Sequence, residues 1–208
     1  MRGESFRANI GYLPQLTPDD LARMRFVDVE ASGLHATSYP IEVGWCGLDL
    51  KPVSMLIKPL PEWGPNDWSY QAEQVHGISR ETLEREGMDA REVAEAIAAE
   101  FRGCEIFSDA PGFDAKWLMT LFSAVDVRPG FGMRPVEDAQ ALCARAAAKP
   151  FTSLQGLVMV MEDVSRFYRH THRAGDDCLR QAAQCRGLYD NEWYAALLES
   201  KRGGKPPL

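Results

Sequence analysis

The sequence predicts an α/β fold in which a mixed β-sheet carries helices on its faces. Three strand-like segments come first, and the second and third are separated only by the short connection DLKP. A parallel crossover needs about a dozen or more residues, so this connection predicts antiparallel neighbours. Helical and strand patterns then alternate along the chain, as they do in sheets that are covered by helices.

The first strand shows the clearest pattern. The segment RFVDVE at 25–30 alternates Phe26 and two acidic residues with Val27 and Val29, which is the period of a β-strand. The charged side chains therefore lie on one face, and the valines lie on the other. Further strands are expected at 40–48, 53–58 and 104–108.

Helical spacing of apolar residues begins after a stretch rich in Pro and Trp. Ser79 is a suitable N-cap for the first of these helices, and Gly103 ends the second. Apolar side chains recur every three to four residues within the segments, so each has one face for the core. We expect helices at 79–86, 89–102, 113–125, 136–148, 153–161 and 174–198.

The composition is that of one folded domain. The 208 residues are 45% hydrophobic, and 23 basic against 30 acidic residues give a net charge of −7. This balance excludes a protein that coats nucleic acid by charge alone, but it permits a local nucleic-acid site. We expect an N-terminal extension at 1–22, a single domain at 23–200 and a C-terminal tail at 201–208.

Targeting and cysteine signals are simple. No window approaches the roughly 18 to 20 consecutive apolar residues of a membrane span, and the first residues lack a secretory signal. We therefore expect a cytoplasmic protein with no membrane partner. Its five cysteines are odd in number and form no C-x-x-C pair, so we expect free, mostly buried thiols.

Acidic side chains occur at three places where they need an explanation. Asp28 and Glu30 share one face of the first strand, and Asp114 follows a Pro-Gly turn at the start of a helix. Asp109, at the end of the preceding strand, competes with Asp114 for a role. Taken singly, such residues are usually solvated strand ends or partners of a helix dipole.

The third acidic segment is HRAGDDCLRQA, where the last long helix begins. His172 lies five residues before Asp177, which places an imidazole on the loop near a carboxylate of the first helical turn. Asp176 adjoins it, and acidic pairs are common at helix starts. His170 comes two residues earlier and is interpreted as a surface or substrate-proximal residue.

The three segments together are more specific than any one of them. In this order, D-x-E, then F-D, then H-x-A-x-x-D resemble the three motifs of the DEDDh 3′-to-5′ exonuclease family, which includes ribonuclease T, proofreading exonucleases and oligoribonucleases. The resemblance covers 26–183, and the segments SGL at 32–34, PIEVGW and VHGIS support it. It implies an RNase H-like fold with a mixed five-stranded sheet whose first three strands are antiparallel.

The resemblance implies an enzyme with two divalent cations, Mg²⁺ or Mn²⁺. Hard cations of this kind prefer oxygen ligands, and two of them are suited to phosphodiester hydrolysis. The implied general base is His172, and Asp177 rather than Asp176 falls at the motif position. The implied metal ligands are Asp28, Glu30, Asp114 and Asp177.

The implied substrate is the 3′ end of single-stranded DNA or RNA, which is shortened with release of nucleoside 5′-monophosphates. For Phe113 the alternative is ordinary core packing. A cluster of Arg166, Arg169 and Arg173 supplies local positive charge for phosphates, or else forms a solvated helix end. Several relatives are dimers, so the resemblance leaves a homodimer open. The residues expected to contact substrate are Ser32, Gly33, Leu34 and Phe113.

One departure keeps a second function open. The family usually has His-Asn before F-D, and here Asp109 and Ala110 take those places. The metal set is intact, but the hydrogen bonding of the strand end is not specified. One alternative is a catalytically silent nucleic-acid or protein interaction module on the same fold; another is an α/β domain with solvated acids. The complete set of four carboxylates and one histidine favours the enzyme.

Overall fold

The computed structural model describes residues 16–147, 151 and 153–200. Its described residues form a five-stranded sheet in the order β3-β2-β1-β4-β5. The pairs β1–β2 and β2–β3 are antiparallel, whereas β1–β4 and β4–β5 are parallel. The predicted mixed sheet with three antiparallel strands first is therefore confirmed. The strands are β1 Met24–Ala31, β2 Pro40–Cys46, β3 Val53–Leu56, β4 Glu105–Ser108 and β5 Met133–Pro135.

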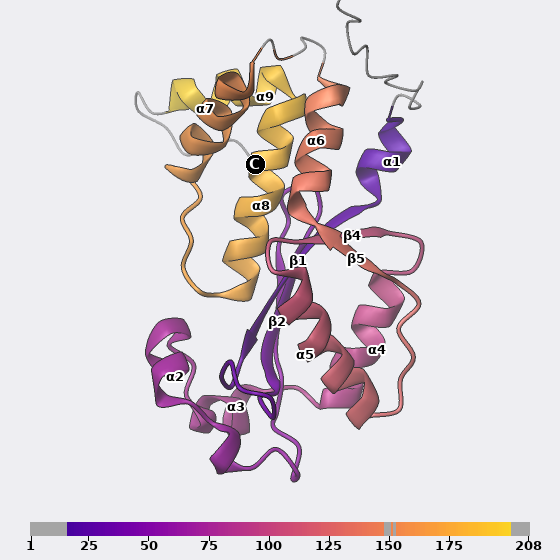
Figure 1. Ribbon diagram of the computed structural model, residues 1–208, viewed down its shortest axis with the longest axis vertical. Coiled ribbons are helices and arrows are strands. Elements are labelled where there is room, and N and C mark those ends of the chain that lie inside the picture. The colour runs from indigo at the N-terminus through magenta and orange to yellow at the C-terminus, as the bar shows by residue number, and fades with distance from the viewer. Residues whose placement is uncertain (1–15, 148–150, 152, 201–208) are drawn as a thin grey trace, which may run out of the picture.

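Helices cover both faces of this sheet (Figure 1). On one face lie α4 (Ala90–Glu100) and α5 (Pro111–Ala124). The other face carries the long helix α8, which packs against β1 and β2 and is surrounded by further helices. The remaining helices are α1 Pro18–Ala22, α2 Tyr70–His76, α3 Arg80–Glu86, α6 Val136–Ala146, α7 Leu154–Ser165, α8 Ala174–Tyr189 and α9 Asn191–Ser200, with a 3-10 turn η1 at Pro65–Asp67.

The two faces of β1 bear out the predicted alternation. Val27 and Val29 are buried in the cluster that includes α4 and α5. Phe26 is buried in the opposite cluster, which includes residues of α6 to α9. Because side chains alternate along a strand, Asp28 and Glu30 continue the Phe26 side, toward α8.

A glycine in β2 allows α8 to approach the sheet closely. Gly44 pairs with Asp28 across the β1–β2 ladder. A Cβ atom added at Gly44 would lie only 2.3 Å from the carbonyl carbon of Ala174, the first residue of α8. The start of α8 therefore rests on bare backbone, directly beside the strand that carries the acidic pair.

The predicted helix at 174–198 is wrong as a single element. It divides into α8 and α9, because Asp190 leaves helical geometry and its Oδ1 accepts the backbone N–H of Trp193 at 2.9 Å. Asp side chains compete in this way with the helical hydrogen bonds of the backbone. The helix expected at 153–161 also continues to Ser165.

Four elements lie outside the expected ranges: α1, α2, the 3-10 turn η1 and the short strand β5. The α2 segment YQAEQVH has too few apolar residues for a helical period, although Ser69 caps its start and Gly77, with φ of 69°, ends it in the left-handed region. A short helix α1 forms at Pro18–Ala22, within the expected extension, and Leu21 packs against the α8-side cluster. Residues 1–15 and the tail 201–208 lie outside the described residues.

The cysteines agree with a further expectation. All five cysteines are free, and four of them are buried. None of the described helices combines the length and apolar character needed to cross a membrane.

Candidate active site

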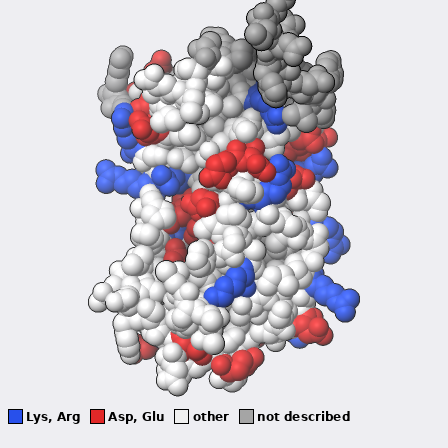
Figure 2. All heavy atoms as spheres, viewed as in Figure 1, with Lys and Arg blue, Asp and Glu red and all other residues white. Residues whose placement is uncertain are grey.

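Carboxylates from β1, α5 and α8 meet at the C-terminal end of β1. One oxygen each of Asp28, Glu30 and Asp177 lies within 4.8 Å of the others, and the same holds for Asp28, Asp109 and Asp114. Asp28 thus belongs to both groups. Acidic side chains gather at mid-height on the face shown in Figure 2, where α5 and α8 approach each other.

These carboxylates disfavour one another's ionised forms. Burial, followed by the charges of Asp114, Glu30 and Asp177, raises the pKa of Asp28 to about 9. Burial and then Asp177 raise the pKa of Glu30 to about 7. Burial is also the main cause that raises the pKa of Asp114 to about 7. Bringing these buried carboxylates together is unfavourable in free energy. Their arrangement is therefore better explained by the binding of a cation than by a contribution to fold stability.

Asp177 offers a specific test of whether a cation fits. The residue is 2% exposed, and its Oδ1 accepts the backbone N–H of Thr171 at 2.9 Å. Its Oδ2 is buried and has no hydrogen-bond partner among the described residues. Buried polar atoms are normally satisfied, and an all-oxygen set with an unsatisfied carboxylate oxygen fits Mg²⁺ or Mn²⁺.

Ser108, the last residue of β4, holds the second motif in place. Its hydroxyl donates a hydrogen bond to Oδ2 of Asp114, and its Oγ accepts the backbone N–H of Ala110 at 2.9 Å. Ala110 itself provides no side-chain cap for α5. The hydroxyl of Ser108 therefore organises the strand end where the family usually has an asparagine. Its place at the end of a strand, before an acidic helix start, is the signal that could have indicated it.

Glu42 is a further buried carboxylate near the site, but it is paired. It lies on β2 opposite Glu30, is 1% exposed, and accepts hydrogen bonds from Arg173, Ser54 and the backbone N–H of Ala174. Burial alone would raise the pKa of Glu42, yet these hydrogen bonds lower it below its usual value. Glu42 is thus ionised, and it caps the N-terminus of α8.

The pairing with Glu42 changes the interpretation of the arginine cluster. Arg173 is paired with Glu42. Arg166, which directly follows α7, donates a hydrogen bond to Asp163 of that helix at 2.6 Å. Two of the three arginines are therefore engaged in ion pairs rather than left for phosphates. Arg173 serves to fix the start of α8.

His172 lies on the loop before α8, where it is exposed. Its φ of 57° falls in the left-handed region, which residues other than glycine rarely adopt. His170 lies between His172 and Asp177: its Nε2 is 3.1 Å from His172 Nδ1, and its Nδ1 is 3.1 Å from Asp177 Oδ1. His170 is half exposed, yet it contacts two site residues, which its sequence position alone did not indicate.

A hollow of about 510 Å³ opens next to Glu30 and His172. Gly33 and Leu34 line one part of it, and residues of α2 line another. Ser32 is buried behind this wall, where its Oγ accepts the N–H of Tyr39 and its carbonyl accepts the N–H of Ser69. Gly33 and Leu34 therefore line the hollow directly, whereas Ser32 shapes it from behind.

Phe113 is not a core residue. It is 49% exposed, and its ring centroid lies 5.6 Å from that of Trp117; Trp117 lines the hollow, whereas Phe113 lies outside its lining. Leu34 is 75% exposed. Large apolar side chains thus remain open to solvent on this side of the site, and core packing of Phe113 is excluded.

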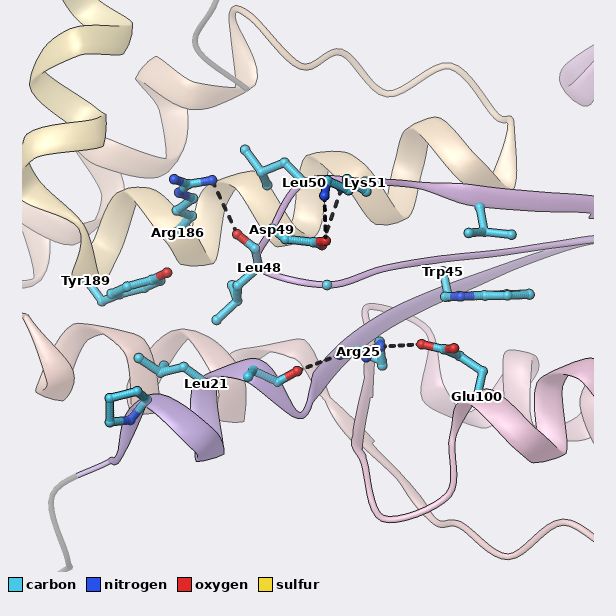
Figure 3. Close-up of a pocket in the computed structure, with 14 residues that line it drawn as sticks. Leu21, Arg25, Trp45, Leu48, Asp49, Leu50, Lys51, Glu100, Arg186 and Tyr189 are labelled. Atoms are coloured by element: carbon cyan, nitrogen blue, oxygen red, sulfur yellow. Dashed lines mark hydrogen bonds and ion pairs between the residues drawn. The ribbon is translucent and has the colours of Figure 1, made fainter.

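A second hollow, of about 1090 Å³, lies at the other end of β1 (Figure 3). Its charged side chains are paired within it: Arg25 Nε donates to Glu100 Oε1 at 2.8 Å, and Lys51 is 4.0 Å from Asp49. Arg186 reaches the carbonyl of Leu48. This hollow is separate from the acidic site, which lies near the opposite end of β1.

The comparisons with known proteins agree with this architecture. No protein-family model matches the chain, and neither does any curated protein sequence. Among solved structures, exonuclease I from Methylocaldum szegediense is 18% identical over 87% of this chain and 45% of its own, with a TM-score of 0.57. Escherichia coli exonuclease I with a dT13 oligonucleotide is 16% identical, with coverages of 85% and 43% and a TM-score of 0.57.

A third structure, the zinc-ion-bound E. coli exonuclease I complex with single-stranded DNA, has a TM-score of 0.59. It is 15% identical over 81% of this chain and 40% of its own. The chain shares the fold of the part of exonuclease I that these matches cover. This confirms the RNase H-like α/β fold implied by the motifs. The chain spans less than half the length of these exonuclease I structures.

Proposed function

We propose that the chain is a metal-dependent 3′-to-5′ exonuclease that acts on single-stranded DNA or RNA and releases nucleoside 5′-monophosphates. The observation that carries this proposal is the pair of carboxylate groups sharing Asp28, next to a hollow bordered by His172. The solved complexes of E. coli exonuclease I with dT13 and dA16 oligonucleotides support a single-stranded substrate.

The carboxylates supply an all-oxygen ligand set. Asp28, Glu30 and Asp177 would hold one Mg²⁺ or Mn²⁺ ion, and Asp28 with Asp114 would hold a second. Asp109 joins this second group in the structure and is a further candidate ligand. Two such ions, when bound, activate a water and stabilise the leaving 3′ oxygen.

His172 is the proposed general base. A neutral imidazole can accept a proton at physiological pH, and its place on the loop beside Asp177 brings it to the edge of the carboxylate cluster. Arg173, the residue directly after His172, is fixed by its ion pair with Glu42. His172 therefore has a defined position although it is exposed.

The hollow next to Glu30 is the proposed site of the terminal nucleotide. Its volume of about 510 Å³ is within the range of small-ligand sites. Gly33 presents backbone without a side chain, Leu34 offers an apolar contact, and Phe113 is exposed for stacking on a base. Stacking of this kind binds single strands without sequence preference.

The test uses single-stranded DNA and RNA of one sequence, labelled at either the 5′ or the 3′ end, with Mg²⁺, Mn²⁺ or EDTA. We expect stepwise shortening from the 3′ end, no shortening in EDTA, and loss of most turnover in His172→Ala with unchanged thermal unfolding. The control Glu192→Gln removes an exposed acid of α9 and keeps full turnover. Binding without cleavage under every condition would instead support the silent interaction module.

A homodimer, which the resemblance leaves open, is tested on the same preparation. Light scattering of the purified chain gives its mass in solution, and twice the chain mass would support the dimer. A mass of one chain would contradict it.

A further inference from the structure

Two imidazoles and a carboxylate converge where the loop before α8 meets the helix. Ring nitrogens of His170 and His172 and an oxygen of Asp177 lie within 4.8 Å of one another. His170 Nε2 and His172 Nδ1 are 3.1 Å apart. Two nitrogens bound at about 2.05 Å to one tetrahedral zinc ion are roughly 3.3 Å apart, so the two ring nitrogens already have the separation that one ion requires, and the rings must turn from their mutual hydrogen bond toward the ion.

The donor types set this cluster apart from the rest of the site. The groups around Asp28 offer carboxylate oxygens alone, which suit Mg²⁺ and Mn²⁺. His170, His172 and Asp177 offer two nitrogens and one oxygen, a set that suits Zn²⁺ and similar transition-metal ions. Asp177 is a member of both sets.

We propose that His170, His172 and Asp177 form a second cation site, selective for transition-metal ions such as Zn²⁺, that competes with the all-oxygen site for Asp177. Its regulatory consequence rests on the proposed function: occupation engages His172 and Asp177 together, and thereby stops Mg²⁺-dependent turnover. The Asp177 carboxylate, whose Oδ1 lies 3.1 Å from His170 Nδ1, is a member of both sets and is therefore the group for which the two sites compete.

Two features of the loop support a ligand role for both histidines. His172 holds a backbone conformation with φ of 57°, and the Arg173–Glu42 pair anchors the residue directly after it. His170 is 44% exposed, which gives an ion access from solvent. The buried His76 differs, because its Nδ1 already accepts the N–H of Ile78.

The first experiment measures binding without any nuclease assay. Co²⁺ replaces Zn²⁺ as a spectroscopic probe, and its visible absorption reports a tetrahedral site; Zn²⁺ affinity is measured by calorimetry. We expect tetrahedral Co²⁺ absorption in the full chain and in Glu30→Gln, which impairs only the all-oxygen set. In His170→Gln we expect the absorption to disappear and Zn²⁺ affinity to fall at least about tenfold.

Two variants make this experiment decisive. His170→Cys restores Zn²⁺ binding if His170 is a ligand, because a thiolate is also a zinc ligand, whereas a purely structural role would not be rescued. His35→Gln, at a histidine outside the cluster, leaves Zn²⁺ affinity unchanged. Equal Zn²⁺ affinity in the full chain and in His170→Gln overturns the proposal, as does loss of binding in Glu30→Gln alone.

The second experiment adds Zn²⁺ to the Mg²⁺-dependent cleavage assay. We expect the Zn²⁺ concentration for half inhibition to rise at least about tenfold in His170→Gln relative to the unmodified chain. An unchanged inhibition midpoint overturns the regulatory consequence. If the chain shows no nuclease activity, the proposed function fails, while the binding experiment still decides whether the site exists.

Discussion

Glu42 on β2 receives the guanidinium of Arg173 on both of its carboxylate oxygens. Arg173 Nε lies 3.0 Å from Oε2, and a terminal nitrogen lies 2.7 Å from Oε1. The backbone N–H of Ala174 donates to the same carboxylate at 3.1 Å. One buried side chain thus ties the loop carrying His172, and the start of α8, to the sheet.

Replacing Glu42 should therefore loosen the site. Glu42→Ala leaves the guanidinium of Arg173 and the N–H of Ala174 without their acceptor, so we expect the unfolding free energy to fall by about 2 kcal/mol. We also expect kcat to fall more than KM rises, because His172 and Asp177 lose their position. Urea unfolding and steady-state cleavage measure both effects. Glu192→Ala serves as the exposed control, and equal behaviour of the two variants would contradict the role of Glu42.

The close approach of α8 predicts that β2 tolerates no side chain at Gly44. In Gly44→Ala, the added Cβ meets the backbone of Ala174 at 2.3 Å, so α8 must move away from the sheet. We expect a loss of about 2–3 kcal/mol in unfolding free energy and of most cleavage activity. Gly130→Ala, where an added Cβ meets nothing within 4 Å, is the matched control and should unfold like the unmodified chain.

Ser108→Ala removes the hydroxyl that links Ala110 to Asp114. The N–H of Ala110 loses its acceptor and Asp114 loses a donor, so we expect about 1–2 kcal/mol lower stability. The Mg²⁺ concentration for half-maximal activity should rise, because Asp114 is no longer oriented. A Mg²⁺ titration of cleavage measures this, and Ser108→Thr, which keeps the hydroxyl, should be closer to the unmodified chain. An unchanged Mg²⁺ requirement in Ser108→Ala would count against this role.

The raised pKa values predict how stability changes with pH when metal is removed. The folded-state pKa of Asp28 is about 9 and those of Glu30 and Asp114 are about 7, so the folded state binds more protons than the unfolded state above about pH 4. In EDTA the unfolding free energy therefore falls as pH rises from about 4 to 9. Melting temperatures should drop more on EDTA addition at pH 8.5 than at pH 6. An equal drop at pH 6 and pH 8.5 would contradict the raised pKa values of these carboxyl groups.

Asp28→Asn should separate stability from function. Asn is neutral without binding a proton, so it avoids the free-energy cost of keeping Asp28 protonated at a pH below its raised folded-state pKa; we expect the metal-free variant to be about 1–2 kcal/mol more stable at pH 8. Cleavage should be lost at the same time, because two ligand groups lose a member. Denaturant unfolding in EDTA and the labelled-strand assay measure the two effects. A variant that is less stable than the unmodified chain would show that Asp28 is a structural residue.

Local patterns explain which parts of the fold and site can be predicted from the sequence. The alternation around Asp28 and Glu30 is a property of one strand. The short DLKP connection limits how the two strands that it joins can pair. Elements with weak apolar periodicity escape this reasoning, as α2 does, and so does the break at Asp190, which depends on one side chain capping the next helix.

The supporting residues could not be predicted in the same way. The role of Glu42 depends on the register that places it opposite Glu30 and on the docking of Arg173 from the far end of the chain. The contacts of His170 depend on the path of a loop. Such roles arise from long-range geometry, which a residue's neighbours in sequence do not determine.

The packing of α8 against Gly44 also has a consequence for how the protein is made. Asp28 is synthesised well before Asp177, and their meeting requires the later helix α8 to dock on the earlier strand β1. Contacts of such long range form slowly. A growing chain therefore holds an incomplete cluster, and the assembled site exists only once synthesis has passed α8.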